Sequence, residues 1–404
     1  MMDDRMDSAP PQATRPGHTT RRESAAPSMR RVGIGVIGCG NISGAYLNGA
    51  RTFPVLDIKG LADAVPAVAE AKAAEFGLRA VALEALLDDP EIEIILNLTI
   101  PKAHVEVGLM ALEAGKHVYS EKPLGIRCDE GRTVLARARQ KGLRVGCAPD
   151  TFFGGAHQRC RHIVDEGTLG TIVGGTAFFM CPGHERWHPN PAFYYQPGGG
   201  PMLDMGPYYI TDLVNLLGPV KSVLGSATKA RERRPILSEP LRGQFIEVEV
   251  ATHVAGIMEF ACGAVVQIAT SFDVAGHKHL PLEIYGTDAT LIVPDPNRFG
   301  GQVQILPKGG EWADVATDMP YADANHRGIG LADMALALRD GRPHRASGEL
   351  ALHVLEVIEA FEKSAAAGRR IAIESSATRP APLSDDLIDG RLGPAPAPAS
   401  KTGG

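Results

Sequence analysis

The stretch "VGIGVIGCGNIS", residues 32–43, decides the fold of this chain. It opens with a short apolar run that ends in glycine, which is typical of a buried strand in a parallel sheet. Gly38 and Gly40 then follow the spacing of a G-x-G-x-x-G motif, with Ser43 in the place of the third glycine. Such glycines allow a tight turn and the close approach of a pyrophosphate, which the N-terminus of the next helix then faces. The stretch therefore predicts the first β-α unit of a dinucleotide-binding fold.

Beyond this stretch, strand-like and helix-like segments alternate strictly up to residue 150. The further strand-like segments are 55–63, 92–100, 117–123 and 143–149. Such alternation is typical of a parallel sheet with helices on both faces. We therefore predict a Rossmann domain of the α/β class, built on a doubly wound parallel sheet, over residues 31–150.

After residue 150, several strand-like segments come close together and are joined by short turns. One segment, "GIMEFACGAVVQI" at 256–268, predicts a hairpin across Cys262 and Gly263. Closely spaced strands predict a mostly antiparallel sheet, and two helix-like segments follow them. We expect an α+β domain at 151–374, with late helices that can pack back on the first domain. The proline-rich ends, 1–30 and 375–404, are predicted to be disordered tails.

The composition of the 404 residues is that of an ordinary globular protein, with 44% hydrophobic and 22% charged residues. The net charge of -6 argues against nucleic acid or an anionic membrane as a partner. No apolar run is long enough to cross a membrane. The pair Arg21 and Arg22 lacks the apolar segment that an export signal needs, and the six cysteines contain no C-x-x-C pair. We expect reduced thiols and a cytoplasmic location.

Asp63 ends the second strand-like segment, 23 residues after Gly40. A carboxylate at this place accepts hydrogen bonds from the adenosine ribose hydroxyls and repels a 2′-phosphate. No arginine or lysine follows Asp63 closely, so the sequence favours NAD over NADP. The alternative is a glycine-rich turn that binds nothing, with Asp63 as a helix cap.

The segment "LTIPKAHVEVGLMALEAGKHVYSEKPLG", residues 98–125, resembles the Gfo/Idh/MocA oxidoreductase family. A Thr-x-Pro turn leads to a histidine, and a Gly-Lys-His-Val strand then enters Glu-Lys-Pro. The residues that carry this pattern are Thr99, Pro101, His104, Glu121, Lys122 and Pro123. With "GVIGCGNIS" upstream and "GGGPMLDMG" downstream, the resemblance covers roughly residues 30–370.

This resemblance implies a nicotinamide-binding Rossmann domain and a second domain with an open antiparallel sheet, which often serves homo-oligomer contacts. It implies that Lys122 lies near the nicotinamide and the reacting oxygen, and that Asp204 orients the substrate. Most members carry a catalytic histidine where this chain has Tyr208, but the glucose–fructose oxidoreductase and dihydrodiol dehydrogenase branches also place tyrosine there. The cofactor-binding residues implied by the motifs are Gly38, Gly40, Asn41, Ile42, Asp63, Thr99, Pro101, His104, Glu121 and Lys122.

Asp204, Tyr208 and Asp212 are spaced by four residues within "GGGPMLDMGPYYITDLVNLLG", residues 198–218. On a helix this spacing places all three on one side. Asp204 could instead cap the start of the helix, and Tyr208 could be an ordinary packed tyrosine. Asp212 could orient Tyr208 or the substrate, cap the helix, or face solvent. A helix that begins only after Gly206 would leave Asp204 outside it.

Tyr208 can transfer protons only if its phenolate is accessible near neutral pH. The pKa of free tyrosine is about 10, but a lysine ammonium and an oxidised nicotinamide both favour the phenolate. We therefore expect Lys122 and bound NAD to lower the pKa of Tyr208 and to make it a general acid/base. The neighbouring Tyr209 is the weaker candidate, because on a helix it points about 100° away.

The segment "CPGHERWHPNPAFYYQPGGG", residues 181–200, precedes this helix and is rich in aromatic residues. It can wall a substrate pocket, in which His184, Arg186 and Trp187 would contact hydroxyls or sugar faces. A lid or an interface is an equal alternative. His184 and His188 are four residues apart, but the prolines there argue against a helix and no acidic ligand joins them. No metal site is predicted.

Together these features indicate an NAD-dependent oxidoreductase acting on CH–OH groups. It would transfer a hydride between the cofactor and a hydroxyl or carbonyl carbon of a sugar, a sugar derivative or a cyclic polyol, with Tyr208 and Lys122 as the proton-transfer pair. One alternative is a nicotinamide-binding regulatory protein without turnover. Another is an enzyme that holds NAD tightly and recycles it in place, as in epimerases or eliminases of the family.

Overall fold

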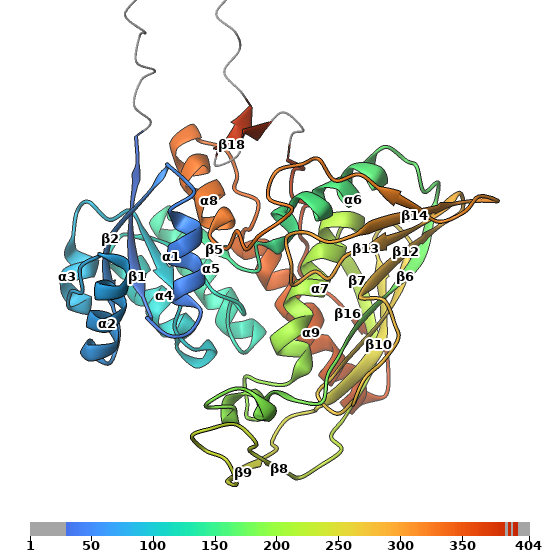
Figure 1. Ribbon diagram of the computed structural model, residues 1–404, viewed down its shortest axis with the longest axis horizontal. Helices are drawn as coiled ribbons and strands as arrows, with labels where there is room; N and C mark the ends of the chain where they lie inside the picture. The colour runs from blue at the N-terminus through green and yellow to red at the C-terminus, as the bar shows by residue number, and fades with distance from the viewer. Residues whose placement is uncertain (1–29, 384–386, 389–390, 395–404) are drawn as a thin grey trace, which may run out of the picture. The chain divides into compact units, whose positions relative to one another are not determined.

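The computed structural model describes residues 30–383, 387–388 and 391–394, and two large β-sheets dominate it (Figure 1). The first sheet is parallel, with the strand order β2-β1-β3-β4-β5. Its strands are β1 (Val32–Ile37), β2 (Leu56–Ala62), β3 (Ile94–Asn97), β4 (His117–Ser120) and β5 (Val145–Cys147). The helices between them are α1 (Ser43–Ala50), α2 (Pro66–Phe76), α3 (Leu83–Asp88), α4 (His104–Glu113) and α5 (Cys128–Lys141). The predicted α/β Rossmann sheet is confirmed.

The strand order explains where a ligand can bind. The chain runs from β1 outward to β2, and then crosses to β3 on the other side of β1. In such sheets the crevice at the carboxyl ends of the two strands flanking the reversal is the binding position. The turns after Ile37 and after Asn97 lie at this position. Every residue of β1 is buried, which accounts for its unbroken apolar pattern.

The second sheet has the order β15-β14-β13-β12-β6-β11-β10-β7-β16. Neighbouring strands are antiparallel except for β6 and β11. The hairpin expected across Cys262 and Gly263 is confirmed as β10 and β11. The strands are β6 (Ile172–Met180), β7 (Val220–Thr228), β10 (His253–Phe260), β11 (Val265–Ser271), β12 (Leu282–Gly286), β13 (Ala289–Val293), β14 (Val303–Pro307), β15 (Ala313–Val315) and β16 (Ile371–Ala372).

Four helices cover this sheet or join it to the first one. They are α6 (Gly155–Asp165), α7 (Pro201–Leu217), α8 (Ile329–Asp340) and α9 (Gly348–Ala367). Helix α7 lies against β6, β10 and β11, and it also contacts α6 and α9. Helix α9 contacts α5 and β5 as well as β7, and α8 contacts α1 and β5. The late helices therefore pack on elements of both sheets, and the described part of residues 31–404 belongs to one compact unit.

A small lobe supports the loop between β6 and α7. It consists of the hairpin strands β8 (Arg233–Pro235) and β9 (Phe245–Glu247) and the short helices η3 (His184–Arg186) and η4 (Ala192–Tyr195) (Figure 1). Its apolar cluster consists of Tyr195, Ile236, Ile246, Val248 and Phe272. The loop is long, and a loop of this length often lacks structure of its own. Here the apolar cluster gives it a small core.

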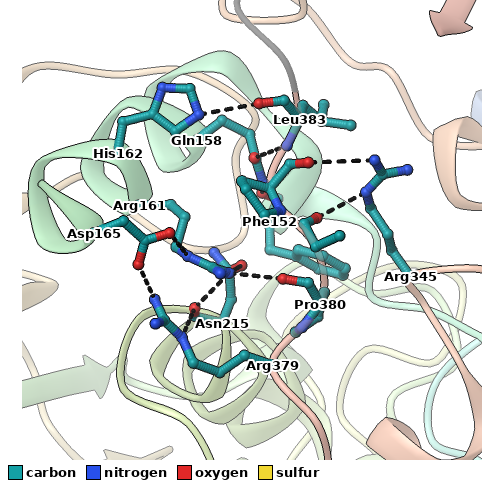
Figure 2. Close-up of polar contacts among 12 residues, drawn as sticks. Phe152, Gln158, Arg161, His162, Asp165, Asn215, Arg345, Arg379, Pro380 and Leu383 are labelled. Carbon is teal, nitrogen blue, oxygen red and sulfur yellow. Dashed lines mark hydrogen bonds and ion pairs between the residues drawn. The ribbon is translucent and has the colours of Figure 1, made fainter.

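The segment 375–383 differs from its prediction as part of a disordered tail. Ala377 and Leu383 are buried, and the segment is hydrogen-bonded to α6 and α7 (Figure 2). Arg161 donates to the carbonyl oxygen of Pro380 at 2.8 Å, and Gln158 accepts from the backbone N–H of Leu383 at 2.7 Å. Further along, β17 (Leu387–Ile388) pairs with β18 (Arg391–Pro394).

The predicted N-terminal tail lies outside the described residues, which begin at Arg30. All six cysteines are free thiols. No helix in the described part of the chain is long and apolar enough to cross a membrane. The boundaries 31–150 and 151–374 stay predictions, although the change from one sheet to the other falls between β5 and α6.

Candidate active site

The glycine-rich turn after β1 has the geometry that a bound pyrophosphate requires. Gly38 has a φ of 99°, and a Cβ there would lie 2.6 Å from the backbone of Leu98. A Cβ at Gly40 would meet nothing within 4 Å, so the backbone there is open to a ligand. Ser43, at the place of the third glycine, is fully buried and donates to the carbonyl oxygen of Gly40 at 2.7 Å. This hydroxyl closes the turn at the start of α1.

Asp63 ties β2 to this turn. One carboxylate oxygen accepts from the backbone N–H of Cys39 at 2.8 Å, and the other accepts from Val65 at 2.9 Å. Asp63 does not cap α2, because the residue at the N-cap is Val65 and no side chain accepts a capping hydrogen bond there. Each oxygen keeps a further lone pair for a ribose hydroxyl. A cavity beside it is lined by Gly38, Gly40, Asp63, Thr99, Ile100, Glu70, Glu84 and Glu106, among others.

His104 joins the turn after β3 to the loop after β4. Its ring nitrogens lie 2.7 Å from the carbonyl oxygen of Pro123 and 3.0 Å from that of Thr99. Burial lowers the pKa of His104, against the opposing effect of these carbonyl groups. Asn97, which the sequence did not single out, completes the turn by accepting from Thr99 and donating to the carbonyl oxygen of His104. These residues hold the two loops at the crevice together.

Glu121 shapes the loop that carries Lys122. Its buried carboxylate accepts from the hydroxyl of Tyr46 at 2.8 Å and from the backbone N–H of Lys122 at 2.7 Å. Tyr46 lies on α1, so the carboxylate connects the helix that follows the glycine turn with the lysine loop. Both of these hydrogen bonds of Glu121 are made to other residues of the protein, so its role in the structure is to hold the lysine loop against α1.

Lys122, in the loop after β4, and Asp204, on α7, form a close ion pair. The ammonium lies 2.8 Å from Oδ1 of Asp204 and 2.8 Å from its carbonyl oxygen. Burial raises the pKa of Asp204, but Lys122 and His184 more than offset this and lower it to about 2. Burial likewise disfavours the charged lysine, yet Asp204 and Tyr208 raise its pKa overall. Both groups are therefore charged at neutral pH.

Helix α7 begins at Pro201, so Asp204 lies in its first turn and not outside it. Tyr208 lies one turn later and is 5% exposed. The Lys122 ammonium is 5.2 Å from the centre of the Tyr208 ring, and Nη2 of Arg327 donates to the Tyr208 hydroxyl at 3.3 Å. Burial raises the pKa of Tyr208 more than Lys122 and Arg327 lower it. The expectation that Lys122 and bound NAD together lower this pKa stays a prediction, since in the chain without cofactor the opposing effect of burial is larger.

Asp212 does not join this group, which corrects the prediction that it contacts substrate or Tyr208. It is buried, with Oδ2 2.8 Å from Nδ1 of His157 and Oδ1 3.4 Å from the amide of Asn215. A four-residue step on a helix advances by about 40° beyond a full turn, so two steps rotate Asp212 about 80° from Asp204. Tyr209 also points elsewhere, with its hydroxyl 3.4 Å from Asp295.

His184 reaches the ion pair from the loop 181–200. Nε2 of His184 lies 3.2 Å from Oδ2 of Asp204, while Trp187 donates to Nδ1 at 3.2 Å. The indole donor leaves the proton of a neutral imidazole on Nε2, which then donates to the carboxylate. Trp187 is 58% exposed, and Arg186 is exposed and, within the described part of the chain, forms no hydrogen bond or ion pair with Asp204 or Tyr208. The structure thus brings His184 into the site but leaves Arg186 at the surface.

A buried charge network fixes this loop. Arg234, on β8, donates to Glu185 at 3.0 Å and to the carbonyl oxygens of Pro182 and Phe272, both at 2.9 Å. It also forms an ion pair with Asp273. Because Glu185 follows His184 directly, the network holds the imidazole where it meets Asp204. Spacing gave no signal for it, since 49 residues separate Arg234 from Glu185.

Arg327 is a further site residue that the sequence analysis did not single out. It lies 119 residues beyond Tyr208, in a loop before α8 with no motif of its own. Within the described residues, no group of three or more His, Cys, Asp or Glu side chains is placed to hold a metal ion.

Two family models match this chain. The one described as an oxidoreductase family with an NAD-binding Rossmann fold matches residues 32–148, and the one described as a GFO/IDH/MocA C-terminal domain matches residues 157–292. Together they cover more than half of the chain.

Curated relatives and solved structures agree with these matches. The chain is 24% identical over 350 residues to 1,5-anhydro-D-fructose reductase of Ensifer adhaerens, covering 84% of this chain and 98% of the relative. It is 32% identical over 138 residues to trans-1,2-dihydrobenzene-1,2-diol dehydrogenase of Mus musculus, covering 34% and 40%. The structure of levoglucosan dehydrogenase in complex with NADH and L-sorbose shares the fold, with a TM-score of 0.76 and 21% identity over 86% of this chain and all of that one. The chain therefore belongs to the Gfo/Idh/MocA family of oxidoreductases.

Proposed function

We propose that this oxidoreductase uses NAD to interconvert a hydroxyl and a carbonyl group on a sugar, a sugar derivative or a cyclic polyol. The observation that carries the proposal is the group formed by Lys122, Asp204 and Tyr208 beside the loops at the Rossmann crevice. A buried phenol with two cations close by and a carboxylate–lysine pair is suited to moving a proton to and from a bound alcohol.

The cofactor's place follows from the open backbone of the crevice. Gly38 and Gly40 would pass close to the pyrophosphate, and Asp63 would accept from a ribose hydroxyl. The turn with Thr99 and the loop with Lys122 would flank the nicotinamide end. When bound, the nicotinamide supplies the acceptor or donor of the hydride.

The proton is handled by the protein's own groups. The Tyr208 hydroxyl would take the alcohol proton during oxidation and return it during reduction. Lys122 supplies positive charge near the phenol, and Asp204 holds the ammonium in place at 2.8 Å. Since burial raises the pKa of Tyr208, these charges must work against desolvation, and an oxidised nicotinamide would add to them.

The charges around the cavity support NAD over NADP. Its lining includes Asp63, Glu70, Glu84 and Glu106, which would repel a 2′-phosphate. Lys72, whose ammonium would lie 3.9 Å from a Cβ at Gly44, is paired with Glu75 at 2.7 Å.

Polar groups and relatives together support the substrate class. His184 and Asp204 offer hydrogen-bond partners to hydroxyls, and the exposed indole of Trp187 offers a flat apolar face beside them. A polar cavity is lined by Asp295, Asn297 and Arg327, and the guanidinium of Arg327 also donates to the Tyr208 hydroxyl. Two relatives are named for an anhydro-fructose and for a dihydrobenzene-diol, and polyhydroxylated or cyclic compounds of this kind would suit a pocket with these polar and aromatic groups.

The experiment is a panel of sugars, glycosides and cyclitols, each incubated with NAD⁺ and with NADP⁺, with absorbance of the reduced cofactor as the readout. The proposal expects reduced cofactor to accumulate with at least one polyol and faster with NAD⁺. Tight NADH binding with no turnover across the panel would favour a regulatory protein. Product formation without release of NADH would favour recycling in place.

A further inference from the structure

The guanidinium of Arg327 contacts the one atom through which the proposed proton transfer passes. Its Nη2 donates to the Tyr208 hydroxyl at 3.3 Å, and the guanidinium carbon is 5.7 Å from the ring centre. In contrast, the position of Lys122 is defined by its contact with Asp204, and its ammonium faces the ring from 5.2 Å.

The charge balance differs between the two cations. The Lys122 charge is largely cancelled by Asp204 at 2.8 Å. No carboxylate within residues 30–383 forms an ion pair with Arg327, although Glu121 and Asp150 lie near enough to interact with its charge. The guanidinium therefore contributes the less compensated positive charge at the phenol.

A second observation concerns the other terminal nitrogen of Arg327. Its Nη1 is buried without a hydrogen-bond acceptor among the protein's atoms. A buried donor without an acceptor is unfavourable, and in a native protein it calls for an explanation such as a catalytic role. Arg234, by comparison, donates to Glu185, to Asp273 and to two backbone carbonyl oxygens.

The protein fixes the position of Arg327 from several sides. Nη2 also donates to the side-chain oxygen of Asn297 at 3.3 Å. Asp150 accepts from the backbone N–H groups of the next residue, Gly328, and of Gly330 at 2.9 and 3.1 Å. Helix α1 approaches so closely that a Cβ at Gly49 would lie 1.8 Å from the carbonyl oxygen of Arg327.

We propose that Arg327 is a further catalytic residue, whose hydrogen bond and charge act together with Lys122 to stabilise the phenolate of Tyr208. This inference rests on the proposed function of Tyr208 as the acid/base. The other charged or titratable groups that face Tyr208 are Glu121, Lys122, Tyr194 and Asp204. Those that face Arg327 are Tyr46, Glu121, Asp150 and Tyr208.

The test compares Arg327→Met with Arg327→Lys, which keeps the positive charge but loses the paired N–H donors of the guanidinium. Arg339→Met is the control. Arg339 lies on α8, and among the residues that the structure describes its one ion-pair partner is the exposed neighbour Asp340. The phenolate absorbance of each protein is titrated against the same protein carrying Tyr208→Phe, which requires neither substrate nor cofactor. Arg327→Met is expected to raise the pKa of Tyr208 by about one unit or more, and Arg327→Lys by less.

Turnover supplies the second readout once a substrate is known. For alcohol oxidation, the limb of kcat/KM that rises with pH should move to higher pH by the same amount in Arg327→Met, with a drop of about tenfold per unit at neutral pH. If Arg327→Met does not fold, Asn297→Ala removes the contact that orients the guanidinium and should cause a smaller shift in the same direction.

An unchanged titration of Tyr208 in Arg327→Met would overturn this inference, as would a raised KM with an unmoved pH profile. Either outcome leaves the proposed function intact. A shifted titration in a protein that oxidises no polyol would instead sink the proposed function and keep the electrostatic role of Arg327.

Discussion

At the residue scale, the central feature is a lysine and an aspartate that neutralise each other beside a phenol. Lys122 and Asp204 are 82 residues apart, so no local pattern in the sequence pairs them. The Glu-Lys-Pro and Asp-x-Gly segments could be identified only through resemblance to the family. Arg327 has no such segment, and its contact with Tyr208 exists only in the folded chain. The residues of the site were thus predictable where a motif carried them and hidden where the fold alone brings them together.

The ion pair makes stability depend on acid in a defined window. The pKa of Asp204 is lowered to about 2, so its stabilising effect is full above the unfolded pKa of about 4 and is lost as the pH falls through 2. We predict that Asp204→Asn unfolds with on the order of 2 kcal/mol less free energy at neutral pH, and that the deficit shrinks below about pH 4. Urea unfolding at several pH values measures it.

The matched control for this measurement is Asp340→Asn, whose carboxylate is 45% exposed. It should be neutral throughout. A deficit of Asp204→Asn that stays constant down to about pH 3 would show that the charge of Asp204 is not its source.

At the scale of elements, α7 and the preceding loop build the site together. The sequence placed the helix correctly but misjudged Asp212, because a helix buried on nearly all sides has no single functional face. The loop 181–200 was recognised as aromatic, yet its support was not foreseen. Its order depends on Arg234 and Glu185, which pair across two elements and lie in a lobe whose strands have three residues each.

Removing this support should loosen the loop. We predict that Arg234→Met lowers the free energy of unfolding by about 3–5 kcal/mol, since it leaves Glu185 buried without its partner. It should also raise KM for the substrate more than it lowers kcat, because His184 would no longer be held at Asp204. Denaturant unfolding and steady-state kinetics measure the two effects.

The adjacent Arg233 is the natural control, as it is 59% exposed and pairs with the exposed Glu247. Arg233→Met should change neither quantity appreciably. Equal behaviour of the two variants would mean that the buried network does not position the loop.

At the scale of the whole molecule, the fold class was predictable because alternation of strands and helices is a strong, local signal. The packing of residues 375–383 against the rest of the protein was not predictable. Residues 375–383 look like a disordered tail in composition, but their binding partners Gln158 and Arg161 lie more than 200 residues earlier. Arg379 adds a contact to Asp165 at 2.7 Å, so the segment joins α6 and α7 from outside (Figure 2).

This segment should contribute measurably to stability. We predict that a chain ending at Glu374 unfolds with on the order of 3 kcal/mol less free energy than one ending at Leu383, because it loses the burial of Leu383 and several hydrogen bonds. Comparison of the two truncated chains isolates residues 375–383. Identical unfolding midpoints would show that their contacts contribute nothing net.

The most direct test of the whole account is the turnover of Tyr208→Phe with the substrate found in the panel, alongside its affinity for NAD⁺. The substitution removes only the hydroxyl and keeps the packing of the ring. The account predicts that kcat falls by at least about 10²-fold while the Kd for NAD⁺ stays at the wild-type value. A kcat close to that of the wild type would contradict it, because the proton would then have to pass through another group.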